Sequence, residues 1–403
     1  MNKTTKDKTI LILPDGPIAE ENGNYKYSKG ERLYIDNLAK DFKEVYLATF
    51  VLRKGSPFYE TVLHSEFEAK NIKIIELPSS KYSNPSVFKK ILQFIRVFKV
   101  IARTVKQVDV CYVFLPSYPS AFGAFCAKIA RKPHIVYGAD DWVSASESMF
   151  RWDKNRMPIF YRAYAKLNEW MEKKIVSSAL FSVAAGGQLV EKYQRLGCIS
   201  FPTTPRMTLT SSDIRERFDT CSGEVIQLVN VGNLIHDKDQ HTLLEAFALA
   251  REKDNRLRLL IIGEGPEKAP LKNLTKKLEI DNYVTFTGYI ESEFALYEFL
   301  SNSDVFVLSS ITEGFPRVLY EAMCMRLPIV STKVGGVPYL MKHQQNALLV
   351  ECGNKKELAE ALVSISRDGK LRREIIKNAS KTLDDVFVSM GDRQISGLLC
   401  KYM

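Results

Sequence analysis

Short apolar runs alternate with helical patterns along most of this 403-residue chain. We predict strands where such a run ends in glycine or polar residues, at 9–13, 45–50, 72–77, 109–115, 135–137 and 180–185, and again at 225–231, 257–262, 284–287, 305–308 and 328–331. Helical spacing of apolar residues follows most of these runs, and repeated strand–helix units are typical of parallel sheets. The pattern therefore predicts an α/β protein with two Rossmann-like domains. Residues 14–29 are predicted as a polar loop.

The boundary between the two domains is predicted within 202–222, where prolines and polar residues leave no regular period. The first domain is then 1–205 and the second 206–385. Residues 386–403 carry a helical stripe with a glycine interruption, so we expect a helix at the C-terminal end.

The most informative stretch is 303–338, in which the strand at 305–308 ends in a polar turn, Glu313 and Gly314. Pro316 suits the first position of a helix, and that helix carries Glu321. The N-terminus of a helix attracts phosphate, and flanking carboxylates accept hydrogen bonds from sugar hydroxyls. This layout predicts a pocket for a sugar joined to a nucleotide by a diphosphate. The alternative is a plain strand–turn–helix unit in which Glu321 pairs with Arg317.

The segment from Glu313 to Glu321, two glutamates with seven residues between them, resembles the signature of retaining glycosyltransferases with the GT-B fold, especially family 4 (glycosyl transferases group 1). The resemblance implies that Glu313 contacts the donor sugar and Glu321 the ribose. It implies that the diphosphate is held by the backbone of Gly314, Phe315, Pro316, Val318 and Leu319. It also implies two domains that face each other across a cleft, with the helix at 386–403 crossing back to the first domain.

Further residues are assigned by the same resemblance. Gly232 to Lys238 is similar to the family's diphosphate-binding segment, with Lys238 at the lysine position and Asn233 where arginine is usual. Tyr289 lies where the nucleobase is bound, and Gly30 matches a glycine near the donor phosphates and the acceptor, although Gly30 would equally suit an ordinary helix start. Asp140 and Asp141 follow a strand end and are candidates for the acceptor side, although either aspartate would also suit a helix cap.

Residues 87–108 form a predicted amphipathic helix with basic side chains and no acidic ones. Apolar residues recur on one side, while five basic residues lie on the other side or its flanks: Lys89, Arg96, Lys99, Arg103 and Lys106. Such a helix is suited to an anionic membrane surface. The alternative is a helix that packs its apolar side on the first sheet and leaves the lysines in water.

Composition narrows the possible partners and location. The net charge of +10 favours an anionic partner, but the basic residues lack the interleaved aromatics of nucleic-acid-binding surfaces, so nucleic acid is not expected. The dispersed histidines indicate no metal site, and no cofactor is expected. No apolar run reaches eighteen residues, the start does not read as a secretory signal, and seven scattered cysteines fit a reduced, cytoplasmic protein.

The resulting prediction is a retaining hexosyltransferase that moves a sugar from a nucleotide-diphosphate donor to a hydroxyl group of a lipid-linked or surface-polysaccharide acceptor. We expect it in the cytoplasm, as a peripheral protein on the inner face of the cell membrane. Two alternatives stay open: a nucleotide-sugar epimerase of similar architecture, and a catalytically weak sugar-nucleotide-binding scaffold, for which Asn233 is the motive.

Overall fold

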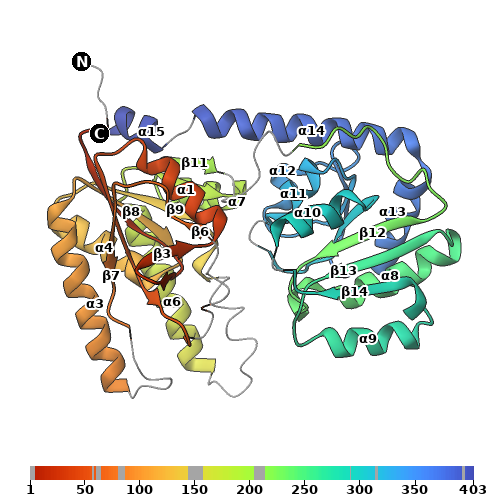
Figure 1. Cartoon of the computed structure of the whole chain (residues 1–403), viewed down its shortest axis with the longest axis horizontal. Coiled ribbons are helices and arrows are strands. Elements are labelled where there is room, and N and C mark those ends of the chain that lie inside the picture. The colour runs from red at the N-terminus through yellow and green to blue at the C-terminus, as the bar shows by residue number, and fades with distance from the viewer. Residues whose placement is uncertain are drawn as a thin grey trace. The chain divides into compact units, whose positions relative to one another are not determined.

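The computed structural model describes residues 5–56, 59, 65–79, 87–143, 158–203, 214–290, 292–313, 316–392 and 395–403 (Figure 1). The chain forms two compact units, the first from Met1–Thr208 with Met390–Met403 and the second from Leu209–Ser389. No helix among the described residues is both long and apolar enough to cross a bilayer.

The first unit is built on a seven-stranded sheet in the order β11-β10-β9-β8-β1-β4-β7, and all its pairings are parallel. Its strands are β1 (Thr9–Leu13), β4 (Glu44–Thr49), β7 (Ile72–Glu76), β8 (Val110–Leu115), β9 (His134–Gly138), β10 (Ser182–Ala185) and β11 (Ser200–Thr203). Its helices are α1 (Lys29–Ala39), α3 (Val87–Gln107), α4 (Tyr118–Ile129), α6 (Pro158–Val176) and α7 (Gly187–Arg195). Helices α3, α4, α6 and α7 share a core with one face of the sheet, and α1 shares a core with the other.

The predicted loop at 14–29 is wrong, because these residues contain a β-hairpin. β2 (Ile18–Glu21) pairs antiparallel with β3 (Asn24–Tyr27), within a four-stranded sheet completed by β5 (Val51–Leu52) and β6 (Ser65–Glu66). Asn22 and Gly23 have φ values of 53° and 85°, as a tight hairpin turn requires. The Asn-Gly pair is a sequence signal for a hairpin turn. It was not recognised, because the side chains of both strands are largely polar and do not show the apolar run from which strands were predicted.

The second unit contains a six-stranded parallel sheet in the order β14-β13-β12-β15-β16-β17. Its strands are β12 (Ile226–Val231), β13 (Leu257–Ile262), β14 (Val284–Gly288), β15 (Val305–Leu308), β16 (Ile329–Thr332) and β17 (Leu348–Val350). Its helical segments are η2 (His236–Lys238), α8 (Gln240–Lys253), α9 (Lys268–Lys277), η3 (Asp281–Tyr283), α10 (Glu293–Ser301), α11 (Val318–Cys324), α12 (Val337–Leu340) and α13 (Lys355–Arg367).

Both sheets reverse their strand order beside their first strand. In the second unit the chain runs from β12 outward to β14, then returns to place β15 on the other side of β12. The loops after β12 and β15 therefore leave the sheet in opposite directions at its carboxyl edge, and open α/β sheets bind ligands at such a point. The α/β prediction with two Rossmann-like units is confirmed.

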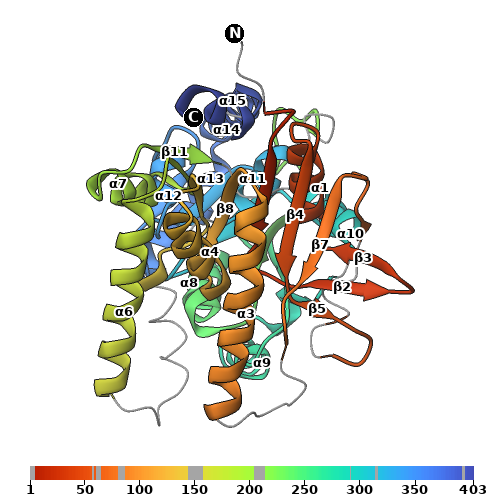
Figure 2. The same ribbon diagram turned by 90° about the vertical axis from the view of Figure 1, so that its left-hand side faces the viewer.

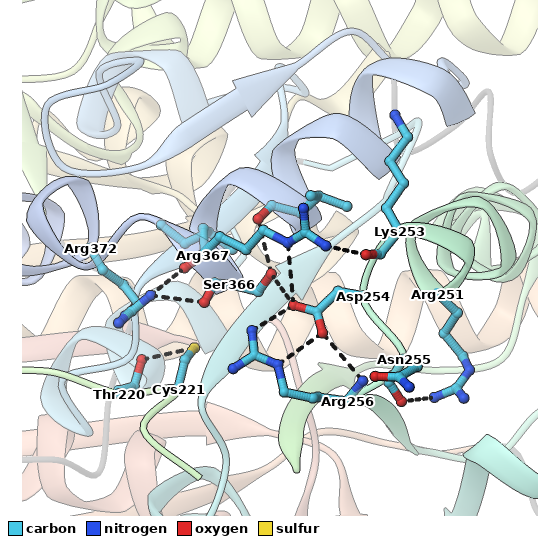
Figure 3. Close-up of polar contacts among 12 residues, drawn as sticks. Thr220, Cys221, Arg251, Lys253, Asp254, Asn255, Arg256, Ser366, Arg367 and Arg372 are labelled. Atoms are coloured by element: carbon cyan, nitrogen blue, oxygen red, sulfur yellow. Dashed lines mark hydrogen bonds and ion pairs between the residues drawn. The ribbon is translucent and has the colours of Figure 1, made fainter. Parts of the chain in front are cut away.

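A polar network joins helices and strands of the second unit at the amino ends of the strands, opposite to the carboxyl edge of the sheet (Figure 3). Asp254, before β13, is only 4% exposed and accepts hydrogen bonds from Arg256 Nε at 2.9 Å and Nη2 at 2.7 Å. Ser366 Oγ of α13 donates to the same carboxylate at 3.1 Å. These bonds hold the pKa of Asp254 at about 2. The network lies away from the carboxyl edge, so we assign it to stability.

The C-terminal residues form α14 (Gly369–Asp392) and α15 (Ile395–Tyr402). α15 packs on the first unit, where Ile395 and Leu399 join the core around α1 and Ser396 Oγ donates to Asp41 Oδ2 at 2.6 Å. Gly391 lies within α14 and Gly397 within α15, so neither glycine of this tail ends a helix. The predicted linker start at 202 also lies inside β11, an edge strand that tolerates Pro202.

Candidate functional site

Lys238 and Glu313 form an ion pair at the carboxyl edge of the second sheet. Lys238 ends η2, which follows β12, and Glu313 follows β15, so the switch in strand order brings the two side chains together. The Lys238 side chain is 24% exposed and that of Glu313 is 10% exposed. Ser310 Oγ donates a second hydrogen bond to Glu313 Oε1 at 2.8 Å. The pair is thus partly shielded from water, which strengthens its interaction with any polar ligand.

The two loops that carry this pair are tied to each other through the backbone. The amides of Ile311 and Thr312 donate to the Asp237 carbonyl at 2.9 Å and 3.4 Å. Ser309 Oγ donates to the Lys238 carbonyl at 2.8 Å. These bonds hold the backbone of both residues of the pair in a defined arrangement. The polar turn at 309–312 was noted in the sequence, but its role in positioning Lys238 needed the contact itself.

Two glycines after β13 allow a third loop to lie against the segment 232–238. Gly263 has φ of 148°, and a Cβ added there would lie 2.0 Å from the Gly232 carbonyl oxygen. Gly265 has φ of 157°, and its Cβ would lie 2.3 Å from the Leu234 oxygen. Real side chains do not fit at such distances, so both positions require glycine. Gly263 and Gly265 are two glycines one residue apart, and a short glycine run most often only turns a chain, so the sequence alone assigns them no role.

The residues between Glu313 and Glu321 are described in part. Gly314 and Phe315 lie outside the described residues. The helix α11 begins at Val318 rather than at the predicted Pro316, because Pro316 first opens a tighter turn in which its carbonyl accepts from the Leu319 amide at 3.2 Å. The Leu319 amide is therefore already bonded within the chain. Glu321 is half-buried in the first turn of α11.

Asn233 and Tyr289 lie on loops at the same edge. Asn233 is exposed, and its carbonyl accepts from Gln240 Nε2 at 3.2 Å. Tyr289 follows the end of β14 and is 57% exposed. Gly288, just before it, accepts a hydrogen bond from the Gly263 amide at 2.9 Å. The candidate residues Gly232, Asn233, Lys238, Tyr289 and Glu313 thus follow three strands of one sheet edge.

The candidate residues of the first unit lie in different places. Gly30 is buried in the first turn of α1. Asp140 and Asp141 follow β9, where Asp141 Oδ2 pairs with Lys192 Nζ of α7 at 2.5 Å. Lys192 also pairs at 2.6 Å with Glu172 of α6, whose side chain is 1% exposed.

The pair formed by Lys192 and Glu172 was missed at the sequence level. Burial raises the pKa of Glu172, and the Lys192 ammonium offsets only part of that effect. Burial alone would lower the pKa of Lys192, but the carboxylates of Glu172 and Asp141 raise it overall. A lysine on α7 and a glutamate on α6 have no sequence pattern that relates them. Lys192, which is itself paired with the buried Glu172, therefore fixes the position of Asp141.

The chemistry available at the edge of the second sheet is polar binding. An ammonium that stands beside a shielded carboxylate can contact an anionic group, while the carboxylate accepts hydrogen bonds from hydroxyl groups. Within the ranges that the structure describes, no three His, Cys, Asp or Glu side chains gather as metal ligands would. The absence of a metal site therefore stays a prediction.

Residues 215–382 match the family model described as "Glycosyl transferases group 1". N-acetyl-alpha-D-glucosaminyl L-malate synthase of Bacillus anthracis is 30% identical over 179 residues, which is 44% of this chain and 45% of that protein. Lipopolysaccharide core biosynthesis glycosyltransferase LpsD of Rhizobium meliloti (strain 1021) is 29% identical over 178 residues, 42% of this chain and 50% of that protein. The chain thus matches about half the length of these two curated relatives.

Solved structures resemble the whole chain. Anabaena Alr3699/HepE, crystallised in complex with UDP and glucose, superposes with a TM-score of 0.65 at 19% identity, covering 97% of this chain and 99% of that one. At this identity the likeness establishes the fold alone. The chain therefore has the GT-B fold, as the resemblance of the segment from Glu313 to Glu321 to that family implied.

Proposed function

We propose that this protein is a retaining glycosyltransferase, which moves a hexosyl group from a nucleotide-diphosphate donor to a hydroxyl group of an acceptor. The observation that carries the proposal is the ion pair of Lys238 and Glu313 at the β12–β15 switch point. That pair lies within the residues that match the glycosyltransferase family, and a structure of the same fold is a complex with UDP and glucose.

In this proposal the two residues of the pair act on different parts of the donor. The Lys238 ammonium binds the diphosphate and stabilises the charge that grows on it as it leaves. The Glu313 carboxylate accepts hydrogen bonds from sugar hydroxyls and orients the ring. Before donor binding, each residue neutralises the other, so a partly buried charge is never left alone. Glu321 contacts the ribose, and the exposed Tyr289 lies beside the base.

The transfer itself exchanges one bond at the anomeric carbon. The bond from that carbon to the diphosphate oxygen breaks, and a bond to the acceptor oxygen forms on the same face. The acceptor proton goes to the departing phosphate oxygen, and nucleoside diphosphate is released. No side-chain base takes part, so the work of the protein is positioning and charge stabilisation. We propose no metal or other cofactor for this step.

The acceptor is proposed to be a lipid-linked intermediate or a growing surface polysaccharide. One similar protein is named for lipopolysaccharide core biosynthesis, which supports an envelope acceptor. Asp141, held by Lys192, is the candidate group on the acceptor side. We place the protein in the cytoplasm, as a peripheral protein on the inner face of the cell membrane.

The test is a thermal-shift panel of nucleotide sugars on the full chain. A donor at about 100 times its dissociation constant adds about 2.7 kcal/mol of stability, which raises the melting temperature measurably. Glu313→Gln should abolish this response, and Glu351→Gln, an exposed glutamate of the same unit, should keep it. If no nucleotide sugar shifts the wild-type protein, the proposal is refuted.

The configuration of the product separates the enzyme from its alternatives. Proton NMR of the fresh product should show the anomeric configuration of the donor. Conversion of the donor sugar without any acceptor would instead identify an epimerase. Donor binding with no turnover across many acceptors would identify a scaffold, and an inverted product would refute retention.

A further inference from the structure

Between Ile91 and Phe98, α3 exposes several large apolar side chains to solvent, although Val97 is buried. Ile91, Phe94, Ile95 and Phe98 are 51%, 47%, 45% and 39% exposed. Further along the same helix, Ile101 is fully buried in the core of the first unit. The apolar stripe predicted from the sequence is therefore longer than the surface that covers it. Core packing explains the buried positions Val97, Ile101 and Val105 and leaves the exposed apolar residues from Ile91 to Phe98 unexplained.

The exposed stripe continues onto two neighbouring helices. The rings of Phe94 and Phe98 lie 6.0 Å and 5.9 Å from that of Phe122 on α4. On the other side of α4, Phe125 stacks on Trp170 of α6 at 6.3 Å. Figure 2 shows α3, α4 and α6 together on one face of the first unit. We call this the apolar face; its exposed members are Ile91, Phe94, Ile95, Phe98, Leu167 and Trp170.

Basic side chains border the apolar face. Lys89, Arg96, Lys99, Arg103 and Lys106 of α3 are all exposed, and α3 contains no acidic residue. On α6, Lys166 and Glu169 are exposed, so one acid is present at this margin. The surface therefore combines large apolar side chains with an excess of positive charge.

We propose that the apolar face and its basic border dock on an anionic lipid bilayer. The proposal rests on the membrane location given above and names the surface responsible. Helices with an apolar side and a basic side lie in the plane of a bilayer interface, and tryptophan favours that depth. A second copy of the chain fits less well, because a symmetric contact through this face would place the basic borders of two copies near one another.

Co-sedimentation of the full chain with lipid vesicles tests the proposal. The protein should bind vesicles of phosphatidylcholine mixed with phosphatidylglycerol, and should bind pure phosphatidylcholine vesicles weakly. Binding should weaken as salt is added, since the electrostatic part is screened. The double variant Lys99→Glu/Arg103→Glu should lower partitioning at least about 25-fold, because each basic residue at the surface contributes about fivefold.

Two further variants complete the design. Ile91→Asn/Ile95→Asn removes apolar surface without changing the charge and should lower partitioning about tenfold or more. Lys272→Glu/Lys276→Glu makes the same charge change on exposed positions of α9 and should retain most of the binding. Equal loss in the two charge-reversal variants, on α3 and on α9, with no loss in Ile91→Asn/Ile95→Asn, would reduce the effect to net charge and overturn the proposal.

The remaining outcomes are equally decisive. A wild-type protein that ignores anionic vesicles refutes the docking surface. Dimerisation in solution that Ile91→Asn/Ile95→Asn abolishes would assign the apolar face to a second copy instead. The donor thermal shift is recorded on the same samples, so failure of the transferase proposal, which removes that shift from the wild-type protein, is distinguished from failure of docking.

Discussion

Substitution of Gly263 by alanine tests whether close backbone contact positions the diphosphate-binding segment. The added Cβ would lie 2.0 Å from the Gly232 carbonyl oxygen, more than 1 Å inside an ordinary contact. The neighbouring atom is backbone, so no side chain can turn away. Gly263 is also held by the hydrogen bond from its amide to the Gly288 carbonyl, which restricts its retreat. The segment 232–238 must therefore move.

Two costs follow from this geometry. The backbone of residue 263, at φ of 148°, is unfavourable for any residue except glycine by about 1–3 kcal/mol. The overlap with Gly232 adds about 1–3 kcal/mol of strain. We expect Gly263→Ala to lower the free energy of unfolding by about 3–4 kcal/mol. A displacement of about 1 Å at Lys238 should also lower the transfer rate about 100-fold.

The assay combines urea unfolding, the donor thermal shift and the initial rate of transfer. The matched control is Gly353→Ala, where φ is 72° and no atom lies within 4 Å of the added Cβ. This control carries backbone strain without a clash and should lose about 1 kcal/mol with little change in rate. The reasoning is refuted if Gly263→Ala behaves like this control, because the close contact would then position nothing.

Three other predictions concern charged groups. Lys238→Met and Glu313→Gln should each lower transfer about 10²–10³-fold. The double variant should lose less than the product of the two single losses, because each single change also leaves the charge of its partner uncompensated in a partly buried site; additive losses in the rate assay would contradict this. The pKa of Asp254 lies at about 2 against a usual 3.8, so its contribution to stability is fully present above pH 3.8 and is lost as the pH falls through about 2. Asp254→Asn should therefore cost about 2 kcal/mol at neutral pH and flatten the acid limb of a stability–pH curve, and an unchanged curve would exclude that role. Lys192→Met should lower the free energy of unfolding by about 3 kcal/mol, because it leaves the buried Glu172 without its countercharge. Adding Glu172→Gln should restore the stability but not the KM for the acceptor. If the second substitution restored both, the role of Lys192 would be purely structural.

Much of the fold was predictable because the signals are local. The strands at 9–13, 257–262 and 305–308 were predicted with their observed bounds, since a buried parallel strand is a continuous apolar run with a clear stop. The hairpin at 18–27 was missed, because its strands are short and polar. The start of α11 was placed two residues early, because Pro316 opens a turn before the helix.

The candidate site was predictable in its residues and not in its contacts. The spacing of Glu313 and Glu321 and the segment ending at Lys238 stood out in the sequence alone. The ion pair between Lys238 and Glu313 joins residues 75 positions apart, and it exists because the chain returns to lay β15 beside β12. Periodicity reports which residues form strands, whereas the order of strands in a sheet depends on all of them together.

The sequence by itself determined the repeated strand–helix units, the acidic spacing and the basic amphipathic helix, because each depends on neighbours along the chain. Only the tertiary structure decided that Gly263 must lack a side chain, that Lys192 reaches Asp141, and that α3 leaves apolar residues between Ile91 and Phe98 exposed. Each of these features depends on segments that are far apart along the chain and that close packing brings together in the folded protein.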